Sequence, residues 1–287
     1  MIDLVLPLIV ASLAAAIVAP LLEYITPVAA RRASMTVLIS VAASAMVFLA
    51  HLSMRGIVAI PILGPRLHSV LHLDGVHVVQ SGLVGSVALF VVIFVVFKSV
   101  TMLVSRKKIR DMHPGGVLTV SDSRLFAFAV PGRRPGIIMS DSLVSSLSQE
   151  ELHIVLRHER AHIEGRHDRW IFAATLCALI NPFLTPMKRQ LELSLERIAD
   201  EAAKRECGDA RKVMRALSKV ALSKQDHSIA LGITSSSVPA RIRWLKNGVD
   251  HSHPALTTIV ALGCIAITSL ALIQGHHIAV AVQSICL

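Results

Sequence analysis

Apolar residues gather in long runs in the first hundred positions and in one further run near the C-terminus. Four windows are about 19 or more residues long and nearly free of charge, which at about 1.5 Å per residue suffices to cross a hydrocarbon core of about 30 Å. The windows are Leu4 to Leu22, Ala33 to Leu52, Gly82 to Val104 and Ala255 to Ile273. They predict four transmembrane helices, and we expect the first to stay uncleaved because no basic segment precedes it.

The residues between the third and fourth windows follow shorter periods. Val117 to Val120, Leu125 to Val130 and Ile137 to Met139 alternate as short strands do, and the turn sequence PGRRPG separates the last two. We expect a small antiparallel sheet here. An apolar stretch from Ile171 to Met187 is interrupted by prolines, and it predicts a buried or membrane-grazing helix followed by a turn.

Helical periodicity follows the predicted strands. Ser148 and Glu151 have the S-x-x-E spacing of a capping box, which predicts a helix from Gln149 to about Ile163 that stops at Gly165. Two more helices and a serine-rich linker are expected at Lys188 to Glu206, Asp209 to Ser223 and Gln225 to Ala240.

Charge is distributed unevenly along the chain. The sequence is 53% hydrophobic with a formal net charge of +10, and 24 of its 29 lysines and arginines lie between Ser105 and Pro254. Since basic residues mark the cytoplasmic ends of spans, this segment should be cytoplasmic and both termini outside, in a multi-pass protein of the cell inner membrane. An anionic inner leaflet accounts for the positive excess, so we expect no direct nucleic-acid binding. The four cysteines stand singly and predict no disulfide framework.

The segment from His158 to His162 reads HERAH, an H-E-x-x-H sequence on a predicted helix. Two imidazoles four residues apart lie on one helix face and can reach a single Zn²⁺, while the Glu beside the first can take a proton from a water at the metal. All three side chains fall on or beside the aliphatic face of the helix, where burial requires a cation or a hydrogen-bond network. We therefore expect His158 and His162 to bind zinc and Glu159 to act as the catalytic base.

A catalytic zinc needs a third protein ligand. Glu192, Glu196 and Asp200 border one face of the helix predicted from Lys188. Glu196 is the expected ligand, with Glu192 as its competitor, and Asp200 is expected to orient a ligating histidine through the second ring nitrogen. The alternative for this acidic row is surface pairing with Lys188 and Lys204.

Several motifs together resemble one peptidase family. The matching segments, in chain order, are RRPGIIMSDSL, RHERAH with HD, NPF, LERIADEAA and ARIRWL. Together they are similar to the membrane-bound gluzincin peptidases of the β-lactam sensor-transducer (antirepressor) family, over roughly residues 100 to 247. The resemblance implies a protein substrate, with a winged-helix repressor as the candidate. The site residues that it implies are Glu159 as the base, His158, His162 and Glu196 as zinc ligands and Asp200 as their partner.

The sequence departs from that family in two places. Sensor-transducers end in a penicillin-binding domain, whereas no lysine follows Lys246 here and only Gln274 to Leu287 follows the fourth window. We therefore expect this chain to lack the penicillin-binding sensor domain. Many relatives have an Asp five residues after the second histidine, where this chain has His167 with Asp168 next, and neither residue is assigned a role.

The expected fold is a mainly α integral membrane protein with four transmembrane helices and a cytoplasmic gluzincin-type α+β zinc peptidase domain between the third and fourth. The expected boundaries are residues 1–104 for the three-span membrane domain, 105–254 for the peptidase domain, and 255–287 for the last span and a short tail.

The expected function is that of a zinc-dependent endopeptidase at the cytoplasmic membrane face. We expect it to act in signalling by cleaving a repressor, itself or both, with self-cleavage between Gln225 and Ala240. The strand at Ile137 to Met139 is expected to bind the substrate by adding a strand at the sheet edge. The expected partners are the substrate and the lipid bilayer, and a homodimer stays open.

Three alternatives stay open. A membrane quality-control gluzincin has the same motifs and would cleave many unfolded membrane proteins. A site-2-type intramembrane protease is disfavoured because LDG, Leu73 to Gly75, precedes the HERAH motif instead of following it. A non-enzymatic receptor or metal sensor would bind a metal outside through His68, His72 and His77, although a loop histidine cluster without a role is the simpler interpretation.

Overall fold

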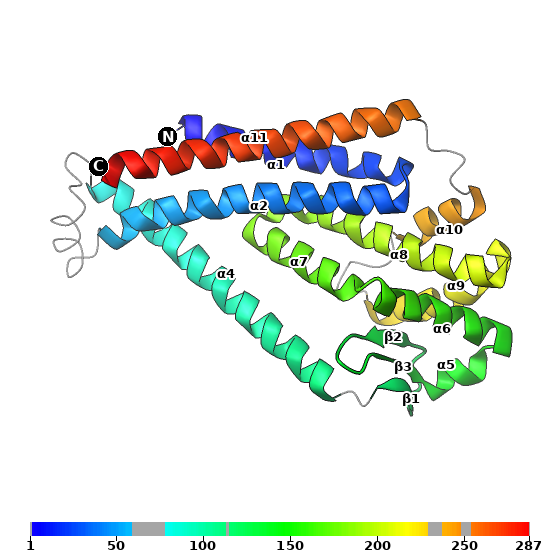
Figure 1. The fold of residues 1–287 in the computed structure, drawn as a ribbon. Helices are drawn as coiled ribbons and strands as arrows, with labels where there is room; N and C mark the ends of the chain where they lie inside the picture. The colour runs from blue at the N-terminus through cyan, green and yellow to red at the C-terminus, as the bar shows by residue number, and fades with distance from the viewer. Residues whose placement is uncertain (1, 59–77, 113–114, 229–236, 248–253, 287) are drawn as a thin grey trace.

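The computed structural model describes residues 2–58, 78–112, 115–228, 237–247 and 254–286 (Figure 1). Within these ranges, four helices are long and apolar enough to cross a membrane. Their candidate spans are Val5–Tyr24, Pro27–Ser53, Leu83–Asp111 and Thr257–Gln274. Each of the four predicted windows coincides with one of these helices, so the expected number of apolar helices is confirmed.

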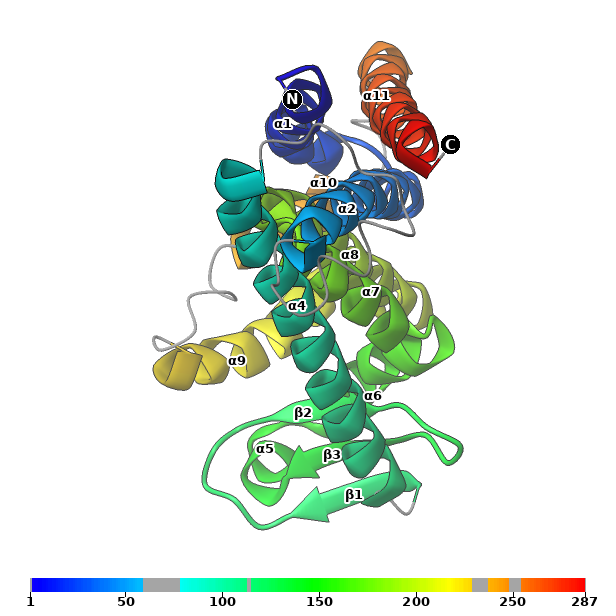
Figure 2. The same cartoon turned by 90° about the vertical axis from the view of Figure 1, so that its left-hand side faces the viewer.

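The long helices form one bundle with an oblique member. Helix α1 (Ile2–Val18) continues into the 3₁₀ helix η1 (Ala19–Tyr24), and it is followed by α2 (Pro27–Val58), α4 (Val78–Met112) and α11 (Pro254–Cys286). Figures 1 and 2 show α1, α2 and α11 side by side, whereas α4 starts beside α2 and runs away from it towards the sheet. Most large apolar side chains of α4 are exposed, as a helix that faces lipid requires.

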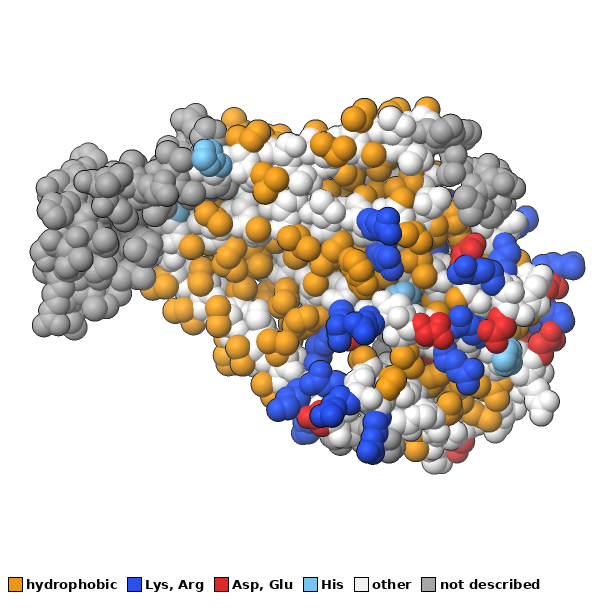
Figure 3. Space-filling view, viewed as in Figure 1, with side chains coloured by type: hydrophobic (Ala, Val, Ile, Leu, Met, Phe, Trp, Pro, Cys, Tyr) orange, Lys and Arg blue, Asp and Glu red, His pale blue; other side chains and the backbone are white. Residues whose placement is uncertain are grey.

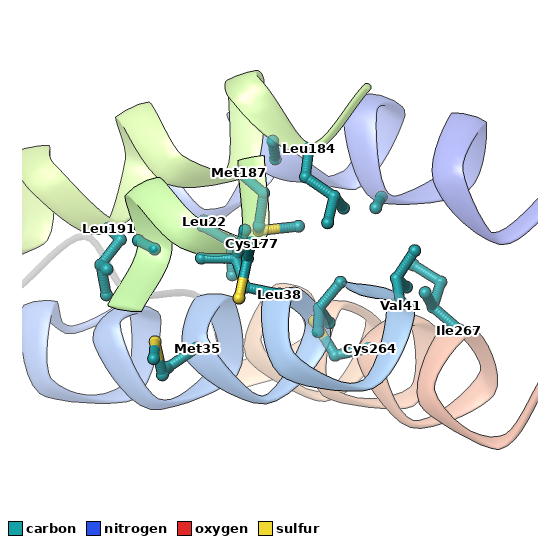
Figure 4. Close-up of a cluster of buried hydrophobic side chains, with 14 of the residues drawn as sticks. Leu22, Met35, Leu38, Val41, Cys177, Leu184, Met187, Leu191, Cys264 and Ile267 are labelled. Atoms are coloured by element: carbon teal, nitrogen blue, oxygen red, sulfur yellow. The ribbon is translucent and has the colours of Figure 1, made fainter. Parts of the chain in front are cut away.

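A helical hairpin enters this bundle from the segment between α4 and α11. It consists of α7 (His167–Ile180), the 3₁₀ turn η2 (Pro182–Leu184) and α8 (Thr185–Cys207). A proline begins η2 and another lies in the first turn of α8, where a missing N–H costs no helical hydrogen bond. The predicted buried helix and turn are therefore confirmed. The labelled side chains of the shared core come from the spans and the hairpin: Leu22, Met35, Leu38, Val41, Cys177, Leu184, Met187, Leu191, Cys264 and Ile267 (Figure 4).

Asn181 holds the tip of the hairpin against α1. Its side-chain Nδ2 donates a buried hydrogen bond of 2.8 Å to Ser12 Oγ, and its Oδ1 accepts one from the backbone N–H of Phe183. Ser12 Oγ in turn donates to the Leu8 carbonyl oxygen. A polar pair among apolar spans is strongly directional, so it fixes how far the hairpin enters the bundle.

Replacing Asn181 by Ala should lower the free energy of unfolding by about 1 to 3 kcal/mol, because it removes a buried hydrogen bond and a cap. Equilibrium unfolding of the full chain in detergent micelles measures the change. Thr185→Ala is the matched control, since its exposed hydroxyl bonds only to the nearby Pro182 carbonyl and its loss should cost little. Equal effects of the two substitutions would show that Asn181 does not anchor the hairpin.

The small sheet has the strand order β1–β3–β2, with β1 at Gly116–Val120, β2 at Ala127–Val130 and β3 at Gly136–Ser140. Strands β2 and β3 are antiparallel across the PGRRPG turn, but β1 and β3 are parallel. The prediction of an antiparallel sheet is therefore wrong for β1. Residues 121–126 lead from β1 to β2, which lies two strand positions away from β1 in the sheet. Strand β3 then fills the position between β1 and β2.

This topology also corrects the expected substrate strand. The segment from Ile137 to Met139 lies in β3, whose two edges are already paired with β1 and β2. A central strand has no free edge to which a peptide can add. The edge strands of the sheet are β1 and β2 instead.

Two helices cover the sheet and form a second core with it. Ser140 caps α5 (Asp141–Ser146), and Ser148 caps α6 (Gln149–Glu164) in the predicted capping box with Glu151. The predicted stop at Gly165 is confirmed as the C-cap. Ile137 and Met139 of the sheet, Leu143 of α5 and Ile154 and Val155 of α6 are buried in this core.

The last helices before α11 differ partly from expectation. Helix α9 spans Ala210–Ser228 and α10 spans Ser237–Asn247, so the predicted linker at Gln225 to Ala240 is wrong at both of its ends. Helix α9 continues past Ser223 through five polar residues to Ser228. Residues 229–236 lie outside the described residues, and so do the LDG motif and the loop histidines: Leu73 to Gly75, His68, His72 and His77.

Candidate metal centre

Helix α6 carries the HERAH motif on its buried side. His158 and Glu159 are 5% and 7% exposed, and the His162 side chain is mostly covered. Arg160 and Glu164 lie on the exposed side of the same helix. The structure therefore has the predicted division of this helix. One face is buried and carries the ionisable groups of the motif, and the opposite face is charged and exposed.

Helix α8 brings Glu196 to the two histidines. The Nε2 atoms of His158 and His162 lie 3.1 Å apart, and Glu196 carboxylate oxygens lie 3.6 and 3.5 Å from them. Four-coordinate zinc, with ligands at about 2.0 to 2.1 Å, holds its ligand atoms about 3.3 Å apart. The triangle of two nitrogens and one carboxylate therefore fits zinc, and these three residues could hold such an ion.

Electrostatics favour a positive charge between the two imidazoles. Burial opposes protonation of His158, but its contacts with the Asp200 and Glu196 carboxylates outweigh burial and raise its pKa to about 9. Burial lowers the pKa of His162 to about 4. The carboxylates around the two facing Nε2 atoms thus favour a positive charge at this group of side chains.

Arg241 of α10 neutralises the carboxylates of α8. Its guanidinium contacts both oxygens of Asp200, at 2.6 and 2.8 Å, and lies 2.9 Å from Glu196. Burial opposes ionisation of both acids, but the charge of Arg241 holds the pKa of Asp200 below its usual range and that of Glu196 well below it. Both carboxylates are therefore ionised at neutral pH. Sequence reasoning assigned no role to Arg241, although it lies in the ARIRWL segment on which the family resemblance partly rests.

Asp200 also reaches the first histidine from behind. One of its oxygens lies 3.1 Å from Nδ1 of His158, close enough for an ion pair but without the alignment of a good hydrogen bond. The Asp200 side chain is fully buried. Asp200 therefore lies behind His158, a histidine of the HERAH motif, as the sequence predicted.

His167 completes the cluster from the corner between α6 and α7. Its Nδ1 lies 2.8 Å from Nδ1 of His162, so one ring donates a hydrogen bond to the other. The ring is 1% exposed, and a Cβ on Gly165 would lie 2.4 Å from its Nε2. Arg166 lies between them in the left-handed region with φ 48°, which turns the chain sharply enough to bring His167 back against α6.

The two remaining acidic candidates lie elsewhere. Glu192 pairs with Lys188 at 2.8 Å, which is the surface pairing that the sequence left open for the acidic row. Asp168 pairs with Arg106 of α4 and not with the histidines. Of the two residues that the sequence left undecided, His167 belongs to the cluster and Asp168 does not.

Residues 99–176 match the sequence model of Peptidase family M48. The matched segment runs from α4 into α7 and includes the HERAH motif, whereas Glu196 lies beyond it. The chain is also similar to the Plastoglobule-localized metallopeptidase 48, chloroplastic, of Arabidopsis thaliana, with 26% identity over 147 residues. That similarity covers 42% of this chain and 43% of the relative, so the chain spans less than half the length of the curated relative it matches.

No solved structure matches this chain. The family match and the relative support a metallopeptidase. Members of that family are generally zinc-dependent, and His158, His162 and Glu196 form a group that could hold a metal ion. Both comparisons place the chain near metallopeptidases in general, and neither separates the sensor-transducer group from other members.

Replacing Gly165 by Ala should push His167 away from His162, because the new Cβ would overlap the ring. The expected loss is about 1 to 3 kcal/mol of unfolding free energy, as for other overpacked sites. Gly263→Ala in α11 is the control, since a Cβ there meets Val18 at an ordinary 3.7 Å. Unfolding in detergent measures both variants, and a neutral Gly165→Ala would mean that the corner yields without cost.

Proposed function

We propose that this protein is a zinc-dependent endopeptidase that hydrolyses peptide bonds at the cytoplasmic face of the cell inner membrane. One observation carries the proposal: two imidazole nitrogens and a carboxylate converge at zinc-ligand spacing beside a buried glutamate on the same helix. A structural ion-pair network alone does not require both Nε2 atoms to face each other. The match to a metallopeptidase family supports the same conclusion.

His158, His162 and Glu196 would hold the metal in this proposal. When bound there, zinc supplies Lewis acidity, which polarises a peptide carbonyl and lowers the pKa of water towards about 7. Arg241 keeps Glu196 ionised, and so keeps it able to bind a cation. Asp200 holds the His158 ring from its Nδ1 side, which leaves Nε2 directed at the metal.

Glu159 is the proposed general base. Its carboxylate is buried on the same side of α6 as the two histidines, one residue after His158. It takes a proton from the attacking water and returns it to the nitrogen of the leaving amine. A single carboxylate can serve both steps because each step leaves it in the form that the next one needs.

The proposed position is the cytoplasmic membrane face, with the peptidase domain between the third and fourth spans. The first two turns of α2 and the last two turns of α4 are both basic, with Arg31 and Arg32 in α2 and Arg106 and Arg110 in α4. Basic residues at span ends mark the cytoplasmic side. The N- and C-termini would then lie outside.

The proposed biological role is signalling, by cleavage of a winged-helix repressor, of the chain itself, or of both. The support is the resemblance of the HERAH and LERIADEAA segments to the antirepressor peptidases. A self-cleavage site would lie between α9 and α10, the two helices that flank residues 229–236.

Replacing Glu159 by Gln should leave about one zinc per chain but lower peptide hydrolysis by about a hundredfold to ten-thousandfold, the usual contribution of a general base. Zinc is measured by elemental analysis of the purified full chain, and hydrolysis with a quenched fluorescent peptide library. Glu164→Gln is the control on the same helix, because this side chain is exposed and pairs only with Arg157. If wild type binds no stoichiometric zinc, or keeps it after His158→Ala with His162→Ala, a receptor or sensor is favoured instead.

Replacing His167 by Ala should weaken zinc affinity about tenfold to a hundredfold, since His162 loses the group that fixes its ring. Competition with a zinc chelator measures the affinity without any substrate. His167→Asp should restore most of it, because a carboxylate can also accept the Nδ1–H of His162. The exposed His153, replaced by Ala, is the control, and an affinity unchanged in His167→Ala would exclude the positioning role.

The signalling role has a separate test. Wild type and Glu159→Gln are produced with a co-encoded winged-helix repressor, and new N-termini are mapped across all proteins. One or a few Glu159-dependent cuts in the repressor or between α9 and α10 would support signalling. Cuts in many unfolded membrane proteins would support quality-control proteolysis instead.

A further inference from the structure

A basic cavity lies between the end of α4, the sheet and the α6–α7 corner. Its volume is about 620 Å³, and residues from all three parts of the fold line it. In Figure 3, arginine and lysine side chains surround a hollow between α4 and the sheet. The arginines that line it are Arg106, Arg110, Arg133, Arg166 and Arg169.

The positive charge of this cavity is largely uncompensated. Asp168 is the one acidic residue in its lining, and it is already paired with Arg106. Arg133, Arg166 and Arg169 have no acidic partner among the described residues. Apolar side chains, including Ile109 and Phe128, line the rest of the wall. The cavity thus joins a cationic rim to an apolar surface, which suits a ligand with an anionic and an apolar part.

The cavity lies where the apolar part of α4 ends. The candidate span of α4 begins at Leu83, and about 20 residues cross the hydrocarbon core, which puts its far boundary near Leu103. Arg106 and Arg110 follow about 4.5 and 10.5 Å further along the helix axis. Because α4 is oblique, it crosses the core with more residues, and this boundary shifts further along the helix towards Arg106 (Figure 1). A headgroup layer of about 5 to 7 Å per side therefore includes Arg106 and adjoins Arg110.

Two contacts place the α6–α7 corner at the same level. The Arg106 guanidinium stacks over the Phe172 ring at 4.5 Å, and that of Arg31, near the start of α2, stacks over the Trp170 ring at 4.8 Å. Tryptophan beside arginine at the ends of spans is typical of the membrane interface. In Figure 3 the blue side chains likewise begin at one margin of the apolar surface, beside α2 and beside α4.

Arg166 lies at the turn between α6 and α7. Its φ of 48° puts a non-glycine residue in the left-handed region, the one such residue among those described. Glycine or asparagine would adopt this conformation at lower cost. The turn places Arg166 in the wall of the basic cavity, between α6 and α7.

We infer that this cavity binds the phosphate headgroup of an anionic phospholipid from the adjoining leaflet. Arg133, Arg166 and Arg169 would contact the phosphate, since guanidinium groups match phosphate oxygens in geometry and charge. The acyl chains would lie along the exposed apolar face of α4. An anionic lipid is favoured over a zwitterionic one because a choline cation would face arginines without an acidic partner. Free phosphate would leave the apolar wall unused.

The test measures lipid retention by the full-length protein. Native mass spectrometry follows binding of phosphatidylglycerol to the protein in detergent micelles, beside phosphatidylcholine and inorganic phosphate as probes. Wild type should retain one phosphatidylglycerol per chain at least tenfold more tightly than phosphatidylcholine. The triple variant Arg133→Gln, Arg166→Gln, Arg169→Gln should bind it at least tenfold more weakly, since each basic residue at an anionic surface contributes about fivefold.

A matched control removes the same charge elsewhere. Arg205→Gln, Arg211→Gln and Arg215→Gln together remove three exposed arginines of α8 and α9 and should change the affinity less than twofold. If the triple variant fails to fold, the double variant Arg110→Gln with Arg133→Gln replaces it in the test. This variant leaves the α6–α7 corner intact and should also weaken lipid binding.

Five results would overturn the inference, and the first four concern the variants and the probes. The triple and double variants could bind phosphatidylglycerol as tightly as wild type, or the control variant could lose as much affinity as the triple variant. Wild type could bind phosphatidylcholine as tightly as phosphatidylglycerol, or millimolar inorganic phosphate could displace the lipid. The last would assign the cavity to free phosphate. An acidic peptide that displaces the lipid where phosphate does not would assign the cavity to the substrate instead.

Discussion

The buried ion pairs of Arg241 are the constraint on which the metal centre depends. Asp200 is fully buried and Glu196 mostly so, and the guanidinium of α10 is the largest of the nearby charges that lower the pKa of both carboxyls. An uncompensated buried charge costs about 3 to 5 kcal/mol, which is a large part of the stability of a protein. The cluster therefore exists only when α6, α8 and α10 are packed together. The site is thus completed by Arg241 of α10, 41 residues after Asp200.

Helix α8 ties this site to the membrane bundle. Its first half contributes Met187, Leu191 and Leu195 to the core that it shares with α1, α2 and α11, and Glu196 and Asp200 follow directly. Arg197 strengthens the junction, since it is 2% exposed, donates to the Glu23 carbonyl and lies under the Trp244 ring. The two motif helices thus meet at the end of the spans. A displacement of the bundle helices would move the third member of the cluster relative to the two histidines.

Sequence periodicity predicted the parts of this structure that local rules decide. The capping box at Ser148 and the inward turn of Glu159 follow from helix geometry, and the four apolar windows follow from length and composition. Strand direction did not follow, because the position of β3 between its neighbours depends on a crossover and not on alternation. Arg241 was missed for the same reason. It lies 41 residues after Asp200, and no spacing rule joins residues whose helices meet only in the folded chain.

The α6–α7 corner joins the two sites in a way that sets the sign of any coupling. Arg166 lines the basic cavity, and the next residue, His167, bonds to His162. One backbone conformation therefore serves both, since the left-handed turn at Arg166 is what brings His167 against α6. An anion held by Arg166 favours the arginine in place and so favours this turn. A metal and an anion that both favour this turn would each strengthen the binding of the other, because a coupling free energy between two sites is reciprocal.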